Sequence, residues 1–425
     1  MAEQLKLEAT LNKPAVPVTS SQQLLYVLIE AVPDEVVAQV RMKLNFGFVL
    51  DRSGSMRGEK IERLIEAVEL ALSRMQADDR ASVTIFSDSA RVLVSSTLLS
   101  SRSSLAAQVR RIRAGGGTEM SRGLSLGLRE VFQHRETDRI NQVLLLTDGQ
   151  THGDEAQCLK LAREAGEHQI PIQALGLGDD WNENLLDEIG TLSGGDADLV
   201  ATADDIVPIF TQTVQRSQQA VLKNAHLTLR LVAGVSPRQV WQVTPMINNL
   251  GYTPLGEHDV QVPLGDLDAV EGKALLVELL VPARRPGRYR LAQAEVSYDI
   301  PTLGLRGASV RAPILVDYSN DQNLTSRYNP RIMNIVERVT AFKLQTRALQ
   351  EAEMGDIAGA TRKLRAAATR LLELGEQDLA AAATDEAENL ERSGHMSSSG
   401  SKRLRYQTRK LTQKLPDLPD EDQDA

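Results

Sequence analysis

The stretch that decides the fold is Phe48–Met56, which reads FVLDRSGSM. An apolar strand leads directly into a turn that carries one carboxylate, Asp51, and two hydroxyls, Ser53 and Ser55, at positions i, i+2 and i+4. Gly54 allows a tight turn, and an amphipathic helix is predicted to follow. Oxygen ligands at the end of a strand suit a hard divalent cation, although serines that precede a helix also serve as simple N-caps. This stretch alone therefore leaves a cation site and a pair of helix caps as alternatives.

Two further stretches carry oxygen ligands in the same kind of place. Gly115–Met120 (GGGTEM) is a glycine loop that presents Thr118 just before a predicted helix, and Leu144–Gly149 (LLLTDG) is an apolar strand that ends in Asp148. The carboxyl ends of parallel strands share one edge of a sheet, so these loops are expected beside each other. Two carboxylates and three hydroxyls can fill most of an octahedral Mg²⁺ shell. The sequence predicts a metal site with Mg²⁺ as the cofactor, or Mn²⁺ or Ca²⁺ as alternatives, held by Asp51, Ser53, Ser55, Thr118 and Asp148.

Residues 44–220 alternate between apolar strands and amphipathic helices. Phe46–Leu50, Val143–Leu146 and Ile170–Leu177 are continuous apolar runs, as expected for strands that are covered on both faces. Residues 82–94 contain two strands around a Ser-Asp-Ser turn, which predicts an antiparallel hairpin at the edge of the sheet. The pattern indicates an α/β fold with a doubly wound, mostly parallel sheet.

The flanking segments have a different pattern. Residues 1–43 and 221–318 alternate apolar and polar residues with a period of two, which is typical of half-buried strands. We expect residues 1–43 to complete a β-sandwich formed by 221–318, with the α/β domain inserted between its strands. Residues 325–394 predict a helical hairpin or bundle, with a partner-binding helical module as the alternative. Residues 395–425 carry a basic run followed by an acidic run, which indicates a flexible charged tail or a docking peptide.

Composition narrows the class of protein. The 425 residues carry a net charge of −9, which argues against general binding of nucleic acid or anionic membrane. One cysteine, Cys158, excludes an intrachain disulfide. No secretory signal and no apolar run of about 18 residues is found, so we expect a cytoplasmic protein without a membrane span. No nucleophile elbow, P-loop, kinase or zincin motif occurs, so the sequence predicts that the protein is not an enzyme. Two aspartates outside the predicted metal site are given structural roles: Asp88 is assigned to a turn and Asp154 to a helix start.

With these motifs in hand, residues 44–220 resemble a von Willebrand factor type A (VWA) domain, a Rossmann-like fold. The stretches DRSGSM, GT and TDG match the three motifs of its metal-ion-dependent adhesion site in order and context. The resemblance implies that Ser53, Ser55 and Thr118 ligate the metal directly, and that Asp51 and Asp148 do so directly or through water. It also implies that a glutamate or aspartate of a partner protein takes the open position.

The flanks resemble the bacterial relatives of inter-alpha-trypsin inhibitor heavy chains and calcium-activated chloride channel-like proteins. Without a secretion signal or channel segment, neither secretion nor chloride transport is expected here. The helical region and the ending Arg405–Arg409 resemble soluble bacterial proteins that are associated with Ser/Thr kinase, phosphatase and forkhead-associated signalling modules.

The leading hypothesis is a cytoplasmic, Mg²⁺-dependent protein-interaction module that binds an acidic residue of a partner, in bacterial signalling or complex assembly. The alternative is an accessory subunit of an AAA+ ATPase of the MoxR or chelatase type. A metal-dependent hydrolase that uses bound water is the third hypothesis. The sequence offers this third activity no base near the site.

Overall fold

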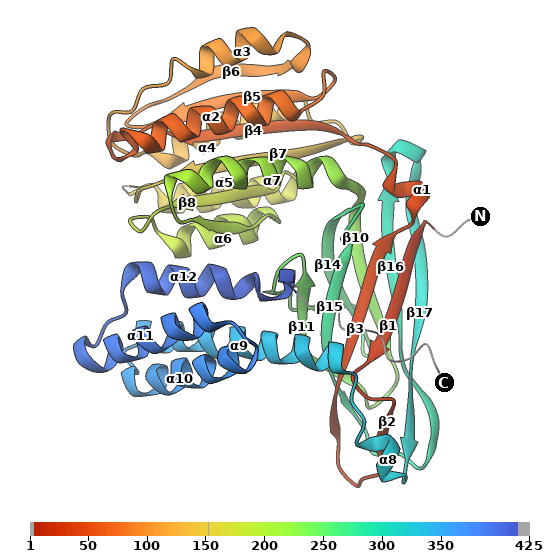
Figure 1. Cartoon of the computed structure of the whole chain (residues 1–425). Helices are drawn as coiled ribbons and strands as arrows, with labels where there is room; N and C mark the ends of the chain where they lie inside the picture. Colours follow the sequence, from red (N-terminus) through yellow and green to blue (C-terminus); the bar gives the residue numbers. More distant parts are fainter. Residues whose placement is uncertain (1–3, 152, 415–425) are drawn as a thin grey trace. The chain divides into compact units, whose positions relative to one another are not determined.

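The computed structural model describes residues 4–151 and 153–414, and the chain divides into two compact units. Arg41–Ala220 form the first, called the α/β unit below. Met1–Val40 together with Val221–Ala425 form the second, called the sandwich–helix unit. The colours of Figure 1 show this order, because red strands from the start of the chain lie beside green and cyan strands that follow residue 220.

The α/β unit is built on a six-stranded sheet with the order β6-β5-β4-β7-β8-β9. The strand β6 pairs antiparallel with β5 at one edge, and the other neighbours run parallel. The predicted mostly parallel sheet with an edge hairpin is therefore confirmed. The strands are β4 (Lys43–Asp51), β5 (Arg80–Phe86), β6 (Ala90–Leu98), β7 (Arg139–Thr147), β8 (Ile172–Leu177) and β9 (Ala197–Val200).

Helices cover both faces of this sheet, which is why its central strands are apolar along their length. Phe46, Phe48 and Leu50 of β4 pack into one buried cluster with residues of three helices, α2 (Glu59–Arg74), α3 (Arg102–Val109) and α7 (Ile206–Gln219). On the other face, Val49 lies against Gly127 so closely that a methyl group at 127 would collide with it. This face carries α4 (Met120–Phe132), α5 (Glu155–Glu167) and α6 (Glu183–Ser193).

The sandwich–helix unit contains two sheets with a common apolar core. The five-stranded sheet has the order β1-β3-β15-β11-β12, and the six-stranded sheet has the order β13-β14-β10-β16-β17-β2. The strands that precede the α/β unit thus enter both sheets. The strands are β1 (Leu5–Leu11), β2 (Ala15–Pro17), β3 (Gln23–Pro33), β10 (Ala220–Leu231), β11 (Ser236–Thr244), β12 (Asn248–Asn249), β13 (Thr253–Pro254), β14 (Asp259–Asp268), β15 (Lys273–Val281), β16 (Gly287–Ile300) and β17 (Leu305–Ser319).

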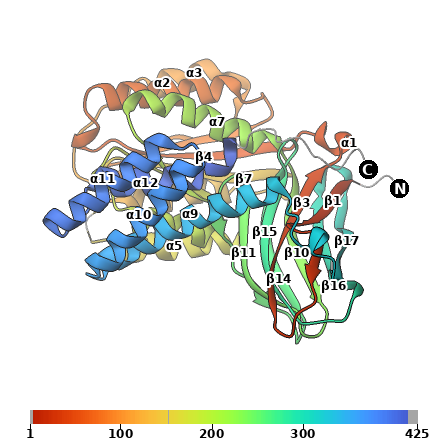
Figure 2. The ribbon, with the colours of Figure 1, turned by 60° about the horizontal axis from the view of Figure 1, so that its bottom comes forward.

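The central strand β15 is buried on both faces, although it belongs to an antiparallel sheet. Leu275 and Val277 lie in the core between the two sheets, whereas Leu276 lies in a second cluster with Leu28, Trp241 and residues of the C-terminal helices. The helical region therefore covers the outer face of the five-stranded sheet, as Figure 2 shows for α9 above β11 and β15.

Helices complete this unit. Three of them, α9, α10 and α11, pack side by side (Figures 1 and 2), which confirms the predicted C-terminal helical region. The helices of the unit are α1 (Glu35–Ala38), α8 (Gln322–Thr325), α9 (Pro330–Glu353), α10 (Ile357–Glu373), α11 (Gln377–Ser393) and α12 (Ser398–Arg409).

The expected flexible tail from residue 395 is wrong for the residues up to 414, which form α12 and a short 3-10 helix. Leu404, Thr408 and Leu411 recur at helical spacing and are buried, and the amide of Ile247 donates to the carbonyl of Arg409 at 2.8 Å. The charged run obscured this apolar stripe in the sequence. The acidic end lies outside the described residues.

Among the residues that the structure describes, no helix is long and apolar enough to cross a membrane.

Candidate metal centre

The five predicted ligands lie on three loops at one edge of the α/β sheet. Asp51 is the last residue of β4, and Asp148 immediately follows β7, its parallel neighbour. Thr118 lies two residues before α4 begins. The carboxyl ends of adjacent parallel strands, which the sequence predicted as the location of the site, do bring the two aspartates together.

Main-chain hydrogen bonds hold the first and second loops against each other. The amide of Gly54 donates to the carbonyl of Gly116 at 2.9 Å, and the amide of Gly115 donates to the carbonyl of Arg52 at 2.7 Å. This reciprocal pair fixes the loop of Ser53 beside the loop of Thr118.

The hydroxyls converge on Asp148. The hydroxyl of Ser55 donates to Asp148 Oδ1 at 2.7 Å, Ser53 Oγ lies 2.9 Å from Ser55 Oγ, and Ser53 Oγ lies 3.4 Å from Asp148 Oδ1. Gly149 lines the same space, because a Cβ atom there would lie 3.7 Å from Thr118 Oγ1 and 3.9 Å from Ser55 Oγ. Oxygens from all three loops therefore face one another.

Asp51 is buried behind this group and is held by neutral donors. Its Oδ1 accepts the amide of Ser53 at 2.7 Å, and its Oδ2 accepts the hydroxyl of Thr147 at 2.6 Å. Burial raises the pKa of Asp51, hydrogen bonds from Thr147 and Ser53 oppose that rise, and the charge of Asp148 adds to it. A positive charge at the site would favour the ionised carboxylate.

The donor set fits a hard divalent cation. It consists of carboxylate and hydroxyl oxygens, the ligands that Mg²⁺ and Ca²⁺ prefer, and the described residues contain no cluster of three or more His, Cys, Asp or Glu side chains that would suit another kind of site. The competing interpretation of the serines as helix caps is wrong, because Ser53 precedes the short 3-10 helix Gly54–Met56 without a side-chain cap, and α2 begins after Gly58.

Asp88 has a larger role than the turn residue that the sequence predicted. Its Oδ1 accepts the amide of Gly117 at 2.6 Å, so the hairpin between β5 and β6 supports the glycine loop that carries Thr118. A Cβ atom at Gly116 or Gly117 would lie 2.5 Å from an Asp88 carboxylate oxygen. The three glycines before Thr118 were the available signal that something approaches this loop closely.

Asp154 also acts away from its own helix. Its Oδ2 accepts the amide of Ser121 at 2.7 Å, in the first turn of α4, and its Oδ1 accepts the hydroxyl of Thr151. Thr151 Oγ1 in turn accepts the amide of Met120 at 3.1 Å and lies 3.3 Å from the carbonyl oxygen of Thr118. The third loop thus anchors the second, a contact for which no periodic pattern is present in the sequence.

A lysine places a positive charge beside the candidate metal centre. Lys60, in the first turn of α2, has its Nζ 2.6 Å from Asp148 Oδ2. This lysine was not assigned from the sequence, because a single charged residue on an amphipathic helix carries no signal of such a contact.

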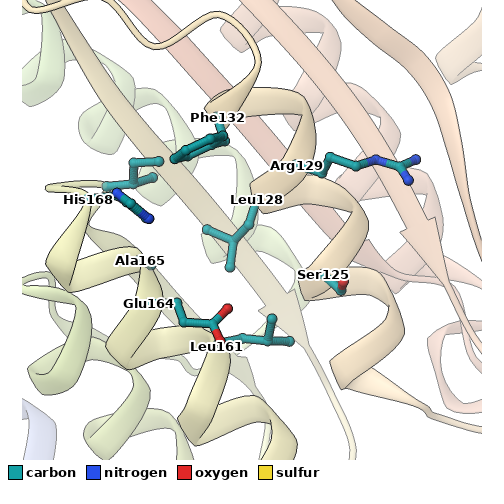
Figure 3. A pocket seen from close by; sticks show the side chains of 9 residues that line it. Ser125, Leu128, Arg129, Phe132, Leu161, Glu164, Ala165 and His168 are labelled. Carbon is teal, nitrogen blue, oxygen red and sulfur yellow. The ribbon is translucent and has the colours of Figure 1, made fainter.

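An apolar hollow of the same unit lies apart from these ligands. Figure 3 shows it between α4 and α5, where the rings of Phe132 and His168 meet edge to face with centroids 4.7 Å apart. Leu128 and Leu161 line its floor. None of the five predicted ligands lines this pocket.

Comparison with known families agrees with the two-part organisation. The model of the von Willebrand factor type A domain matches residues 45–213, and the model of the Sll0103-like C-terminal alpha-helical domain matches residues 330–414. A solved structure described as von Willebrand factor type A from Catenulispora acidiphila has the same fold, with a TM-score of 0.76, 18% identity, and coverage of 95% of this chain and 96% of that one.

Two relatives extend the comparison. Inter-alpha-trypsin inhibitor heavy chain H1 of Homo sapiens is 31% identical over 193 residues, which are 43% of this chain and 21% of that protein. The uncharacterized protein sll0103 of Synechocystis sp. is 33% identical over 291 residues, which are 67% of this chain and 68% of that protein. The chain therefore belongs to the family of VWA-domain proteins that includes Synechocystis sll0103.

Proposed function

We propose that this protein is a divalent-cation-dependent interaction module that binds an acidic residue of a partner protein. VWA domains mediate protein–protein interaction, and the proposal adds the means of recognition. The metal would be held by Asp51, Ser53, Ser55, Thr118 and Asp148, with Mg²⁺ as the resident ion.

The observation that carries the proposal is the convergence of oxygens from three separate loops. Ser55 and Ser53 contact the same oxygen of Asp148 at 2.7 and 3.4 Å, and Thr118 Oγ1 and Ser55 Oγ both lie within 4 Å of the position that a Cβ atom at Gly149 would take. A mere helix cap or turn would need only one loop. Here two further carboxylates, those of Asp88 and Asp154, hold the loops in place by accepting main-chain amides.

The ligand chemistry favours an acidic partner. Three of the five ligands are neutral hydroxyls, so few anionic oxygens would contact a bound divalent cation directly, and the cation would stay electrophilic toward a carboxylate at its open position. The chain's own part is to hold the hydroxyls at one point and to keep Asp51 buried, 0% exposed, with both oxygens already hydrogen-bonded. No step of this kind requires a catalytic base, so we propose binding rather than catalysis.

We further propose that the protein works in the cytoplasm of a bacterium, in signalling or complex assembly. The partners would supply an aspartate or glutamate side chain. Candidates are proteins with Ser/Thr kinase, phosphatase or forkhead-associated modules, in line with the resemblance of the C-terminal helices to soluble bacterial proteins of that setting.

The test begins with the metal. Calorimetric titration of chelator-treated protein with Mg²⁺, Mn²⁺ and Ca²⁺ should show one site, and Thr118→Val should weaken binding, because it removes one hydroxyl and keeps the shape of the side chain. Thr191→Val, at an exposed position of α6, is the matched control and should bind the metal as the original chain does.

Partner capture is the second stage. Immobilised protein should retain a bacterial partner in Mg²⁺ and lose it in EDTA, and Asp51→Ala should capture none of it. Replacing the partner's acidic residues one at a time should identify the carboxylate. Equal capture in EDTA, or by Asp51→Ala with an intact fold by circular dichroism, would exclude the proposed mode of recognition.

A further inference from the structure

The candidate metal centre contains a positively charged side chain of its own. Lys60 Nζ lies 2.6 Å from Asp148 Oδ2, a carboxylate whose side chain is 0% exposed, while the lysine side chain is 35% exposed. Such a short contact between an ammonium and a buried carboxylate is a charge-assisted hydrogen bond.

Asp148 divides its two oxygens between different partners. Oδ1 faces the hydroxyls of Ser53 and Ser55, and Oδ2 faces Lys60. The carboxylate therefore lies between the ligand hydroxyls on one side and an ammonium on the other.

Lys60 is also the main source of charge compensation for the pair of buried aspartates. Asp51 is held by an amide and a hydroxyl, which are neutral. Among the contacts that the structure describes for these two carboxylates, Lys60 supplies the one positive charge. Two buried negative charges without a cation would be costly, so the lysine has a clear stabilising role.

Charge balance predicts what happens when a divalent cation binds. Two carboxylates and one ammonium sum to −1, two carboxylates and one divalent cation sum to zero, and all four together sum to +1 in a largely buried place. A divalent cation beside Oδ1 would be attracted to the same carboxylate as Lys60, and it would repel the ammonium at Oδ2.

We infer that Lys60 is a built-in counter-ion that competes with the divalent cation for Asp148 and so sets the metal concentration at which the site fills. Metal binding moves the lysine side chain off Oδ2 and into solvent, which it already reaches in part. This inference rests on the proposed metal site.

The first measurement is the affinity for Mn²⁺ alone, by calorimetry at fixed pH and ionic strength. Lys60→Met keeps the length of the side chain and removes its charge, so it should bind Mn²⁺ at least tenfold more tightly than the original chain. Lys160→Met is the matched control, because it makes the same change of net charge on an exposed lysine of α5. It should leave the affinity unchanged.

The second measurement follows the lysine itself. Acetylation of Lys60 by a water-soluble reagent, quantified by mass spectrometry, should become several-fold faster when Mg²⁺ is added to chelator-treated protein, whereas Lys160 should react at one rate throughout.

The outcomes separate this inference from the proposed function. If the original chain binds Mn²⁺ and Lys60→Met binds it equally or more weakly, Lys60 supports the ligands and competition is excluded. If none of the three proteins binds Mn²⁺, the proposed metal site itself is wrong. If Lys60→Met binds Mn²⁺ and the other two proteins do not, the ammonium of Lys60 excludes the cation, which supports the inferred competition.

Discussion

The two units each bury acidic side chains, and two such sites differ in how fully that charge is balanced. In the sandwich–helix unit, Glu295 of β16 lies between two guanidinium groups, with Arg230 at 2.9 Å and Arg311 at 2.8 Å. In the α/β unit, the two aspartates of the candidate metal centre share one ammonium, that of Lys60. Arg230 also pairs with Asp259 at 3.1 Å, so two guanidiniums balance two carboxylates around Glu295, whereas one ammonium faces two aspartates at the candidate metal centre.

This difference distinguishes a structural ion pair from the proposed metal site. The two arginines lower the pKa of Glu295 through hydrogen bonds and charge, so its ionised form is already satisfied. Burial raises the pKa of Asp51, and Asp148 adds to that rise, so its ionised form is favoured by a cation from outside the chain. A surplus of buried negative charge on preorganised loops thus points to a ligand.

The largest predicted effect is on Asp148, the residue that the hydroxyls and Lys60 share. Asp148→Asn should weaken Mn²⁺ binding by about 100-fold or more, since changes outside the ligand shell already cost about 10- to 100-fold. Calorimetric titration measures the change. Glu295→Gln is the paired control from the other unit, and a comparable loss of affinity in that variant would overturn the contrast between the two sites.

Asp88 tests whether the support of the glycine loop matters. Asp88→Ala removes the acceptor of the Gly117 amide, so Thr118 should be held less firmly and the Mn²⁺ affinity should fall about tenfold. Asp138→Ala, an exposed position at the amino end of β7, should leave the affinity unchanged. Equal affinities of the two variants would show that the loop is held without Asp88.

Glu295 should affect stability instead of metal binding. The pKa of Glu295 is lower in the folded protein than in the unfolded chain. The ionised carboxylate therefore stabilises the fold at pH values above the unfolded pKa, and this stabilisation is lost as the pH falls through the folded pKa. Glu295→Gln should therefore lower the free energy of unfolding by about 1 kcal/mol at neutral pH, a modest figure because both arginines are half exposed.

Urea unfolding followed by the fluorescence of Trp241, in a Trp181→Phe background, reports on this unit. The difference in the free energy of unfolding between the original chain and Glu295→Gln should shrink as the pH is lowered to about 3. A difference that stays constant with pH would point to packing instead of charge.

The smallest expected effect concerns a buried thiol, that of Cys158. Burial raises the pKa of the Cys158 thiol to about 12, and the charges of Asp154 and Glu155 add to the rise. The folded protein should not react with 5,5′-dithiobis(2-nitrobenzoate) at about pH 8, and one thiol should react after unfolding. Fast reaction of the folded protein would show that burial alone does not keep this group neutral.

The sequence predicted the parts of this molecule that depend on local pattern. Continuous apolar runs in β4 and β7 identified the buried parallel strands, and the oxygens after them identified side chains that the structure brings together at the candidate metal centre. Asp88, Asp154 and Lys60 could not be assigned, because each acts on a loop or strand far away in sequence, and a single charged residue on a turn or helix carries no periodic signal. The helix α12 was missed for a related reason, since its apolar stripe lies among arginines and lysines.

The double burial of β15 has a consequence for how the chain can be divided. Leu276, Leu28 and Trp241 form a continuous apolar surface that the helices from Pro330 onward cover. A protein shortened before that proline would present this surface to water, as an exposed patch of the kind that leads to self-association. The C-terminal helices are therefore expected to keep this surface out of water, and a truncated protein that fails to bind a partner should first be checked for aggregation.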